Sequence, residues 1–231
     1  QVTPPWMYVF EMETLKDALY IGAGSRTNGY SVWRTRRVRA PYRFKPIVTH
    51  GAGRGPLMTG VIAMHRFRGH LYVSAVSWYA TDELPTTEMI RIRSNGKWQV
   101  VVGRPRVARD GRYRYPLSGL MDGFENAFMP HIWRLSSQNG GLYAGTLDWS
   151  YLLQTSKNWP PDDRPGNDQF SGLLSQVLAG ELGFDVWATC DGIDWFPVTR
   201  NSFDGDMYDF GVRILVPAPG GMYIGTANHA H

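Results

Sequence analysis

The sequence predicts an all-β fold, and three observations carry this prediction. Aromatic residues make up 13% of the 231 residues, including 9 Trp and 12 Tyr, and such side chains favour strands over helices. The chain also contains 26 Gly and 15 Pro, which mark turns. Its apolar runs have the length of strands, and none reaches the roughly 18 residues of a membrane-spanning helix. With 43% hydrophobic residues, a disordered chain is excluded as well.

An internal repeat divides the chain into four units. Each unit begins with an apolar strand, passes through a short turn and returns in a second strand that carries a tyrosine followed by small residues. The strand pairs cover residues 8–15 with 18–25, 61–67 with 70–77, 131–137 with 141–148, and 211–216 with 221–228. Their register is marked by Tyr20, Tyr72, Tyr143 and Tyr223. The same hairpin is therefore expected four times.

Two further strands follow each of the first three hairpins. They cover residues 31–35 with 43–48, 88–93 with 98–102, and 185–189 with 195–199. Four antiparallel strands per repeat are typical of a β-propeller blade. The sequence thus predicts a single β-propeller domain over 1–231, with blades at about 6–50, 58–102, 129–200 and 208–231.

The turn between residues 190 and 195 carries the clearest local signal. Asp191-Gly192 indicates a tight hairpin, and Trp195 opens the strand that follows. Residues 95–98 repeat this pattern more weakly. Together with residues 142–146 and 186–192, these turns resemble the Asp-box-like (sialidase-like) β-propeller repeat proteins, a family of uncertain function. The resemblance implies a propeller over most of the chain but no sialidase activity, since the arginine group, Tyr/Glu pair and acidic Asp of that site are not identifiable.

About three and a half four-stranded blades are present, so we expect this chain to be part of a larger ring. The last repeat stops after its second strand, and residues 1–7 are too few to supply the two missing outer strands. An open ring leaves sheet edges and apolar faces uncovered. We therefore expect a second polypeptide, or a missing chain segment, to complete the propeller.

Three insertions separate the strands, at residues 79–87, 103–127 and 149–184. The last contains Phe170, Leu173, Leu174, Val177 and Leu178 at helical spacing, which predicts one short helix. Its apolar stripe is expected to pack on the propeller rim, with a membrane or partner contact as the alternative.

The formal net charge of +4 comes almost entirely from arginine, since only four of the 24 basic residues are lysine. Arginines gather at residues 34–43 and again at 104–114. Guanidinium groups suit phosphate, sulfate or carboxylate, so an anionic ligand or a glycan is one interpretation. The other is a solvated face packed onto aromatic rings. Nucleic acid is not expected, because lysines are few and no recognition motif occurs.

Aligning the repeats on their tyrosines places equivalent residues around a central channel, where propellers build ligand sites. Glu11, Ala63, Arg134 and Arg213 are expected to be equivalent channel-side positions. The predicted ligand-binding residues at the channel mouth are Tyr8, Arg26, Trp78, Trp149, Asn228 and Arg213.

Some residues of the same region could carry chemistry. Asp148, His131, Glu125 and Arg134 form the predicted catalytic set, with a carboxylate orienting an imidazole for acid–base work. The alternative is that Asp148 only holds loop backbone. His131, His229 and His231 could bind a divalent metal, and no other cofactor is indicated.

The single Cys190 excludes an intrachain disulfide and leaves the compartment open. We expect a secreted or periplasmic location, with a cytoplasmic one as the alternative. The function predicted first is an extracytoplasmic propeller that acts as a binding or assembly module through a ligand site at the channel mouth. A glycan-active hydrolase or lyase and a metal-dependent propeller enzyme are the alternatives.

Overall fold

The computed structural model describes residues 7–37, 39–77, 86–151 and 182–229. These residues fold into sixteen β-strands, all paired antiparallel, and three short 3-10 turns. The predicted all-β class is confirmed. The helix predicted in the 149–184 insertion lies on residues outside the described ranges. Within those ranges, no helix is long and apolar enough to cross a membrane.

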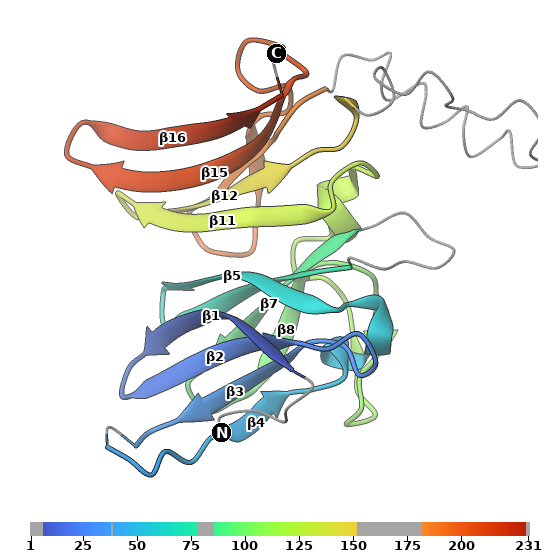
Figure 1. The fold of residues 1–231 in the computed structure, drawn as a ribbon, viewed down its shortest axis with the longest axis vertical. Coiled ribbons are helices and arrows are strands. Elements are labelled where there is room, and N and C mark those ends of the chain that lie inside the picture. The colour runs from blue at the N-terminus through green and yellow to red at the C-terminus, as the bar shows by residue number, and fades with distance from the viewer. Residues whose placement is uncertain (1–6, 38, 78–85, 152–181, 230–231) are drawn as a thin grey trace, which may run out of the picture.

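Three four-stranded units and one hairpin make up the fold (Figure 1). Sheet 1 contains β1 (Tyr8–Leu15), β2 (Ala18–Gly24), β3 (Ser31–Thr35) and β4 (Lys45–Val48). Sheet 2 contains β5 (Gly60–Phe67), β6 (His70–Val76), β7 (Thr87–Arg93) and β8 (Trp98–Val102). Sheet 3 contains β11 (His131–Gln138), β12 (Gly141–Leu147), β13 (Val186–Thr189) and β14 (Phe196–Thr199). The last unit is the hairpin of β15 (Asp209–Ala218) and β16 (Gly221–Asn228), which one residue pair, Leu147 with Gly211, joins to sheet 3.

Turn chemistry fixes the register of these hairpins. Arg68 and Gly69, between β5 and β6, both have positive φ, and so do Asn139 and Gly140 between β11 and β12. A two-residue turn with positive φ at both positions matches the twist of the strands that it joins. All four hairpins close with a two-residue turn, so the marker tyrosines occupy the same place in each of them.

The first strands of the four units lie side by side. β1 contacts β5, β5 contacts β11, and β11 contacts β15. Figure 1 shows sheet 1 and the β15–β16 hairpin at opposite ends of the long axis of the molecule, with sheets 2 and 3 between them. The described residues therefore form an open series of units and not a closed ring.

Each of these first strands carries a β-bulge at the same position. The register shifts between Val9 and Glu11, and between Val212 and Ile214, with matching shifts in β5 and β11. Ile214, and not Arg213, is therefore the equivalent of Glu11, Ala63 and Arg134. Arg213 was predicted by allowing one extra residue for a longer turn near Pro217, but the hairpin closes at Ala218 and Gly221 with a two-residue turn like the others.

The units pack through a repeated contact. A Cβ atom on Gly22 would lie 2.5 Å from Val61 Cγ1, and one on Gly145 would lie 2.5 Å from Val212 Cγ1. Ser74 takes this place in sheet 2, where its hydroxyl donates a hydrogen bond of 2.9 Å to the carbonyl oxygen of Ile132. Three apolar clusters result, one at each junction between neighbouring units.

The 103–127 insertion holds structure that the sequence did not predict. It contains a two-stranded hairpin of β9 (Arg106–Val107) and β10 (Tyr113–Arg114), followed by the 3-10 turn η3 (Asp122–Glu125). Buried ion pairs anchor it, since Arg106 Nη1 lies 2.8 Å from Glu88 Oε2 on β7. Arg54, between η1 (Gly51–Gly53) and η2 (Gly55–Leu57), pairs with Asp122 Oδ1 at 2.9 Å.

Candidate functional site

The predicted site lies where β11 begins and β12 ends. His131 pairs across the strands with Leu147, so His131 and Asp148 fall at the same end of sheet 3. His131 is 9% exposed, and burial lowers the pKa of its imidazole to about 4. This ring is consequently neutral near pH 7, because burial disfavours the charged form of an imidazole.

Asp148 is buried even more deeply, at 1% exposure. Its Oδ2 accepts a hydrogen bond of 2.9 Å from Asn126 Nδ2, and its Oδ1 accepts one of 2.6 Å from the backbone N–H of Ser150. Burial raises the pKa of the carboxyl to about 6, and the hydrogen bonds oppose this rise. The geometry fits the alternative in which Asp148 holds loop backbone. Asn126, its side-chain partner, was missed because nothing in its sequence context distinguishes it from an ordinary loop residue.

The other two members of the predicted catalytic set lie elsewhere. Glu125 ends η3 with an exposed side chain. Arg134 Nε donates a hydrogen bond of 2.8 Å to the carbonyl oxygen of Arg213, and Arg134 Nη1 lies 3.7 Å from Glu11 Oε1. Arg134 thus connects sheet 1, sheet 3 and the β15–β16 hairpin.

The predicted ligand-binding residues are only partly brought together. Tyr8 begins β1 with an exposed ring, and Arg26 is exposed after β2. The Asn228 amide donates hydrogen bonds to Asp209 Oδ1 at 2.7 Å and Asp206 Oδ2 at 3.3 Å. Trp149 lies beside His131, as described next, whereas Trp78 lies outside the described residues.

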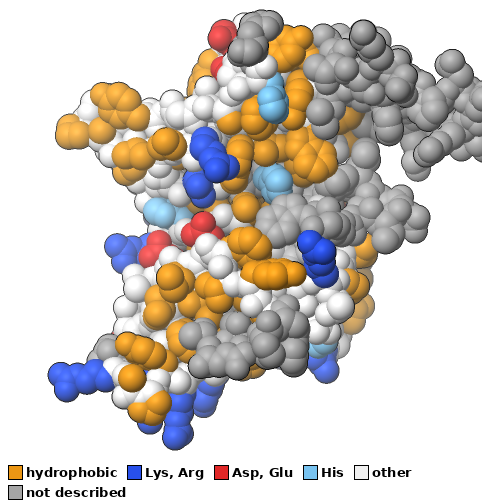
Figure 2. Space-filling model, in the orientation of Figure 1, with side chains coloured by type: hydrophobic (Ala, Val, Ile, Leu, Met, Phe, Trp, Pro, Cys, Tyr) orange, Lys and Arg blue, Asp and Glu red, His pale blue; other side chains and the backbone are white. Residues whose placement is uncertain are grey.

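A row of aromatic rings runs from β11 to the end of β16. The ring of Phe210 stacks on that of His229 with 4.4 Å between centroids, and Tyr151 lies 4.8 Å from His229. Trp133 continues the row, 6.5 Å from Phe210 and 6.2 Å from His131. His131 in turn meets Trp149 edge to face at 6.3 Å, and the Arg213 guanidinium lies 4.5 Å above the Trp133 ring. Figure 2 shows histidine and apolar side chains side by side along this part of the surface.

The histidines do not form a metal centre in the described part of the chain. There, no group of three or more His, Cys, Asp or Glu side chains lies close enough together to hold an ion. His131 and His229 belong to the aromatic row, and His231 lies outside the described ranges.

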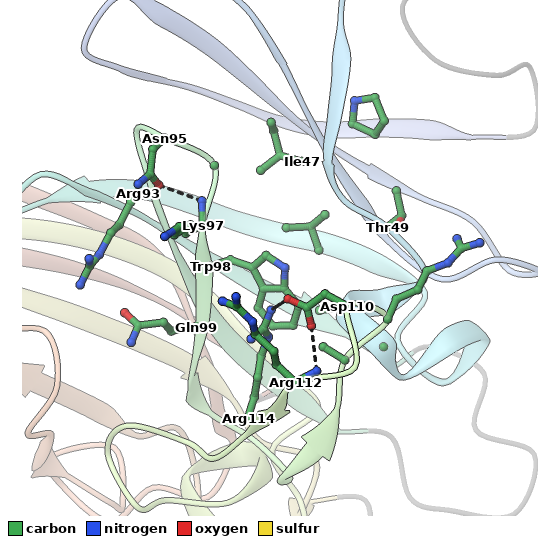
Figure 3. Close-up of a pocket in the computed structure, with 17 residues that line it drawn as sticks. Ile47, Thr49, Arg93, Asn95, Lys97, Trp98, Gln99, Asp110, Arg112 and Arg114 are labelled. Carbon is green, nitrogen blue, oxygen red and sulfur yellow. Dashed lines mark hydrogen bonds and ion pairs between the residues drawn. The ribbon is translucent and has the colours of Figure 1, made fainter.

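A second candidate site is a pocket of about 700 Å³ between sheets 1 and 2, away from the predicted mouth (Figure 3). Its walls are β4, the turn between β7 and β8, and the β9–β10 hairpin. Five cations and one carboxylate line it, namely Arg93, Lys97, Arg109, Arg112, Arg114 and Asp110.

The floor of this basic pocket is held in place by stacking. The Arg114 guanidinium lies 4.1 Å from the centre of the Trp98 ring, and Arg114 Nη2 pairs with Asp110 Oδ2 at 2.6 Å. Asp110 also accepts a hydrogen bond from the backbone N–H of Arg112, and these interactions lower its pKa. One arginine is therefore neutralised, and Lys97, Arg109 and Arg112 are exposed residues of the pocket lining. Arg93 borders the pocket as well, but Figure 3 shows its side chain directed away from Trp98 and Arg114.

The arginines singled out in the sequence divide between two roles. Of the 104–114 group, Arg109, Arg112 and Arg114 line the pocket, whereas Arg104 and Arg106 pair with Asp122 and Glu88. Of the 34–43 group, Arg34 donates to the carbonyl oxygen of Ser94 in the β7–β8 turn of sheet 2, and Arg36 pairs with Asp17 of its own sheet. Arg93 and Lys97, on the opposite rim, were missed because they are separated from these groups in sequence.

Comparison with known proteins adds little to this description. No protein-family model matches the chain, and no curated protein matches it. Among solved structures, the sucrose-6-phosphate hydrolase of Lactobacillus gasseri aligns with a TM-score of 0.44 and 8% sequence identity. The alignment covers 90% of this chain and 38% of that one, so this chain spans well under half the length of that enzyme.

Proposed function

We propose that this protein is a binding module, built as an arc of β-propeller blades, that holds an anionic ligand in the basic pocket between sheets 1 and 2. Five cationic residues and one acidic residue line a cavity of about 700 Å³, and this excess of positive charge carries the proposal. Each guanidinium group can bind two oxygens of a phosphate, sulfate or carboxylate at once. Its N–H donors lie in one plane, so these hydrogen bonds are directional.

The position of the charges suggests how the ligand would be held. Lys97 lies in the turn between β7 and β8, whereas Arg109 and Arg112 belong to the β9–β10 hairpin. A ligand with two or more anionic groups would contact both rims at once. Arg114, which is stacked on Trp98 and paired with Asp110, would serve as the floor and not as a mobile contact.

Calorimetric titration with inorganic tripolyphosphate tests this proposal. The double variant Lys97→Gln/Arg112→Gln removes one cation from each rim and should weaken binding about tenfold or more, because a hydrogen bond to a charged group contributes roughly 1.5–3 kcal/mol. Arg66→Gln/Arg68→Gln removes the same charge at exposed positions of β5 and its turn, outside the pocket. Equal losses in both double variants would show that only net charge matters and would overturn the site.

The aromatic row supports a second candidate, the binding of a sugar ring near the channel side. Tyr151, Phe210 and His229 present stacked or tilted rings, and such faces bind the apolar side of sugars and other flat ligands. Phe210→Ala should abolish retention on an array of neutral oligosaccharides while leaving tripolyphosphate binding unchanged. Retention that persists in this variant would contradict the candidate.

Binding is favoured over glycan hydrolysis by the state of Asp148. A general acid must reach its substrate, whereas this carboxyl is buried and both its oxygens accept hydrogen bonds from the protein. Turnover of any oligosaccharide that Asp148→Asn abolishes would restore the hydrolase alternative.

A further inference from the structure

Every junction between neighbouring units of this fold is built from the same positions. Each of β5, β11 and β15 presents two apolar residues, three positions apart, to the unit that precedes it in the chain. These residues are each at most 9% exposed, and the pairs are Val61 with Met64, Ile132 with Leu135, and Val212 with Leu215.

The preceding unit supplies the other half of each junction. A marker tyrosine and a small residue two positions later lie on the face that receives these apolar pairs. Tyr20 and Tyr72 are 0% exposed, and the small residues Gly22, Ser74 and Gly145 contact β5, β11 and β15 respectively.

The β1 face of sheet 1 carries an equivalent apolar pair, but no described unit of the fold covers it. By the position of the bulge, Val9 and Met12 are equivalent to Val61 and Met64, yet they are 43% and 64% exposed. Apolar side chains that are exposed at a position buried in the other junctions indicate an interaction surface.

The β15–β16 hairpin carries the opposite half-junction, also exposed. Tyr223, the fourth marker tyrosine, is 65% exposed, and Gly225 follows it at the place of Gly22 and Gly145. Ile214 and Val216 stand beside them, half exposed, where β1 has Glu11 and Glu13. Figure 2 shows apolar side chains over β15 and β16 at one end of the molecule and over β1 further down.

We infer that the β15–β16 face of one copy binds the β1 face of a second copy, head to tail, by the junction already used three times within the chain. A second copy is the occupant that the structure supports, because the chain itself presents both complementary halves. Two copies joined this way at both ends contain eight repeats, the upper end of the four to eight blades typical of closed propellers. Three copies would contain more repeats than this range of blade numbers. A heterologous contact that closes after two copies gives a discrete dimer and not a filament. This association does not depend on the ligand proposed above.

Mass measurement by light scattering after gel filtration tests the inference on the full chain. The wild-type protein should elute at twice its 26.1 kDa. Met12→Glu and Tyr223→Glu each place a charge in one half-junction and should reduce the mass to that of a monomer. Tyr115→Glu, at an exposed tyrosine of the 103–127 insertion, is the matched control and should remain dimeric.

Mixing the two interface variants distinguishes head-to-tail docking from other contacts. Tyr223→Glu keeps its β1 face and Met12→Glu keeps its β15–β16 face, so an equimolar mixture should recover one junction and form a heterodimer. Thermal melting should show both variants folded, and Tyr223→Ser with Met12→Ser replaces them if either is not. A wild-type monomer, a filament, variants that stay dimeric, or a mixture that stays monomeric would each overturn the inference.

Discussion

The Tyr72 hydroxyl donates a hydrogen bond to the carbonyl oxygen of Gly192, 3.1 Å away. This bond ties sheet 2 to the turn between β13 and β14, although the two residues are far apart in sequence. The turn itself is held by Asp191, whose Oδ1 accepts hydrogen bonds from the backbone N–H groups of Ile193 and Asp194. The turn at residues 190–195 thus serves the contact between sheets 2 and 3.

Gly192→Ala should destabilise the protein more than Gly140→Ala. Both glycines have φ of +80°, but a Cβ atom on Gly192 would collide with the Tyr72 hydroxyl, whereas nothing lies within 4 Å of one on Gly140. We expect a loss of about 1 kcal/mol in the free energy of unfolding for Gly140→Ala and a further ~1–3 kcal/mol for Gly192→Ala. Urea unfolding measures both, and equal losses would contradict the close approach.

Gly22→Ala and Gly145→Ala should each lower the free energy of unfolding by about 1–3 kcal/mol through overpacking. Each new methyl group would lie 2.5 Å from a valine of the next unit, Val61 or Val212. Val61→Ala should restore part of the loss caused by Gly22→Ala, because it removes the colliding atom. Gly225→Ala provides the control, since its methyl group would meet only Ile214 of its own hairpin, at 3.1 Å. It should alter dimer formation more than folding.

His131 and Asp148 should make opposite contributions to the pH dependence of stability. The pKa of His131 falls from 6.5 to about 4 on folding, so its contribution is lost as pH falls through this window. The pKa of Asp148 rises from 3.8 to about 6, so its contribution is lost as pH rises through nearly the same window. Each amounts to about 3 kcal/mol at 1.36 kcal/mol per pKa unit.

Single variants should separate these two contributions to the change of the free energy of unfolding with pH. In Asp148→Asn the free energy of unfolding should rise between pH 4 and pH 6.5, because only His131 remains; in His131→Phe it should fall over the same range. Urea unfolding at a series of pH values checks this. Slopes of the same sign in both variants would contradict the opposed shifts.

Glu88→Gln should cost about 3–5 kcal/mol of stability, because it removes the carboxylate that pairs with the buried guanidinium of Arg106 and one of the two that pair with Arg54. Glu88 is fully buried, 2.8 Å from Arg106 and 3.6 Å from Arg54. Asp17→Asn breaks the exposed pair with Arg36 and should cost less than about 1 kcal/mol. Thermal melting compares the two variants, and a similar small loss in both would show that the insertion is not anchored by Glu88.

The strand content of the fold could be predicted from the sequence, whereas much of the candidate site could not. Tyr20, Tyr72, Tyr143 and Tyr223 mark four hairpins because strand pairing depends on local alternation and on turn residues, which a sequence displays directly. The β9–β10 hairpin was missed because its strands have two residues each, too few to show a period.

The site depends on contacts between distant residues, which no local pattern reports. Asn126 reaches Asp148, and Lys97 lines the same pocket as the β9–β10 hairpin, only once the units are packed. Asp148 and His131 were correctly placed at one end of sheet 3, since alignment of repeats fixes depth along a strand. It could not show that Asp148 is enclosed, because burial depends on the loop that covers it.

The shared bulge has a consequence for how such a protein diversifies. Its extra residue is Phe10 in β1, Ile62 in β5, Trp133 in β11 and Arg213 in β15, a different chemical class at nearly every occurrence. The register of the strand pair skips this position, so a mutation there leaves the register of the hairpin unchanged. The four units thus offer mutable positions at one common level of the molecule, where new recognition properties can arise without rebuilding the scaffold.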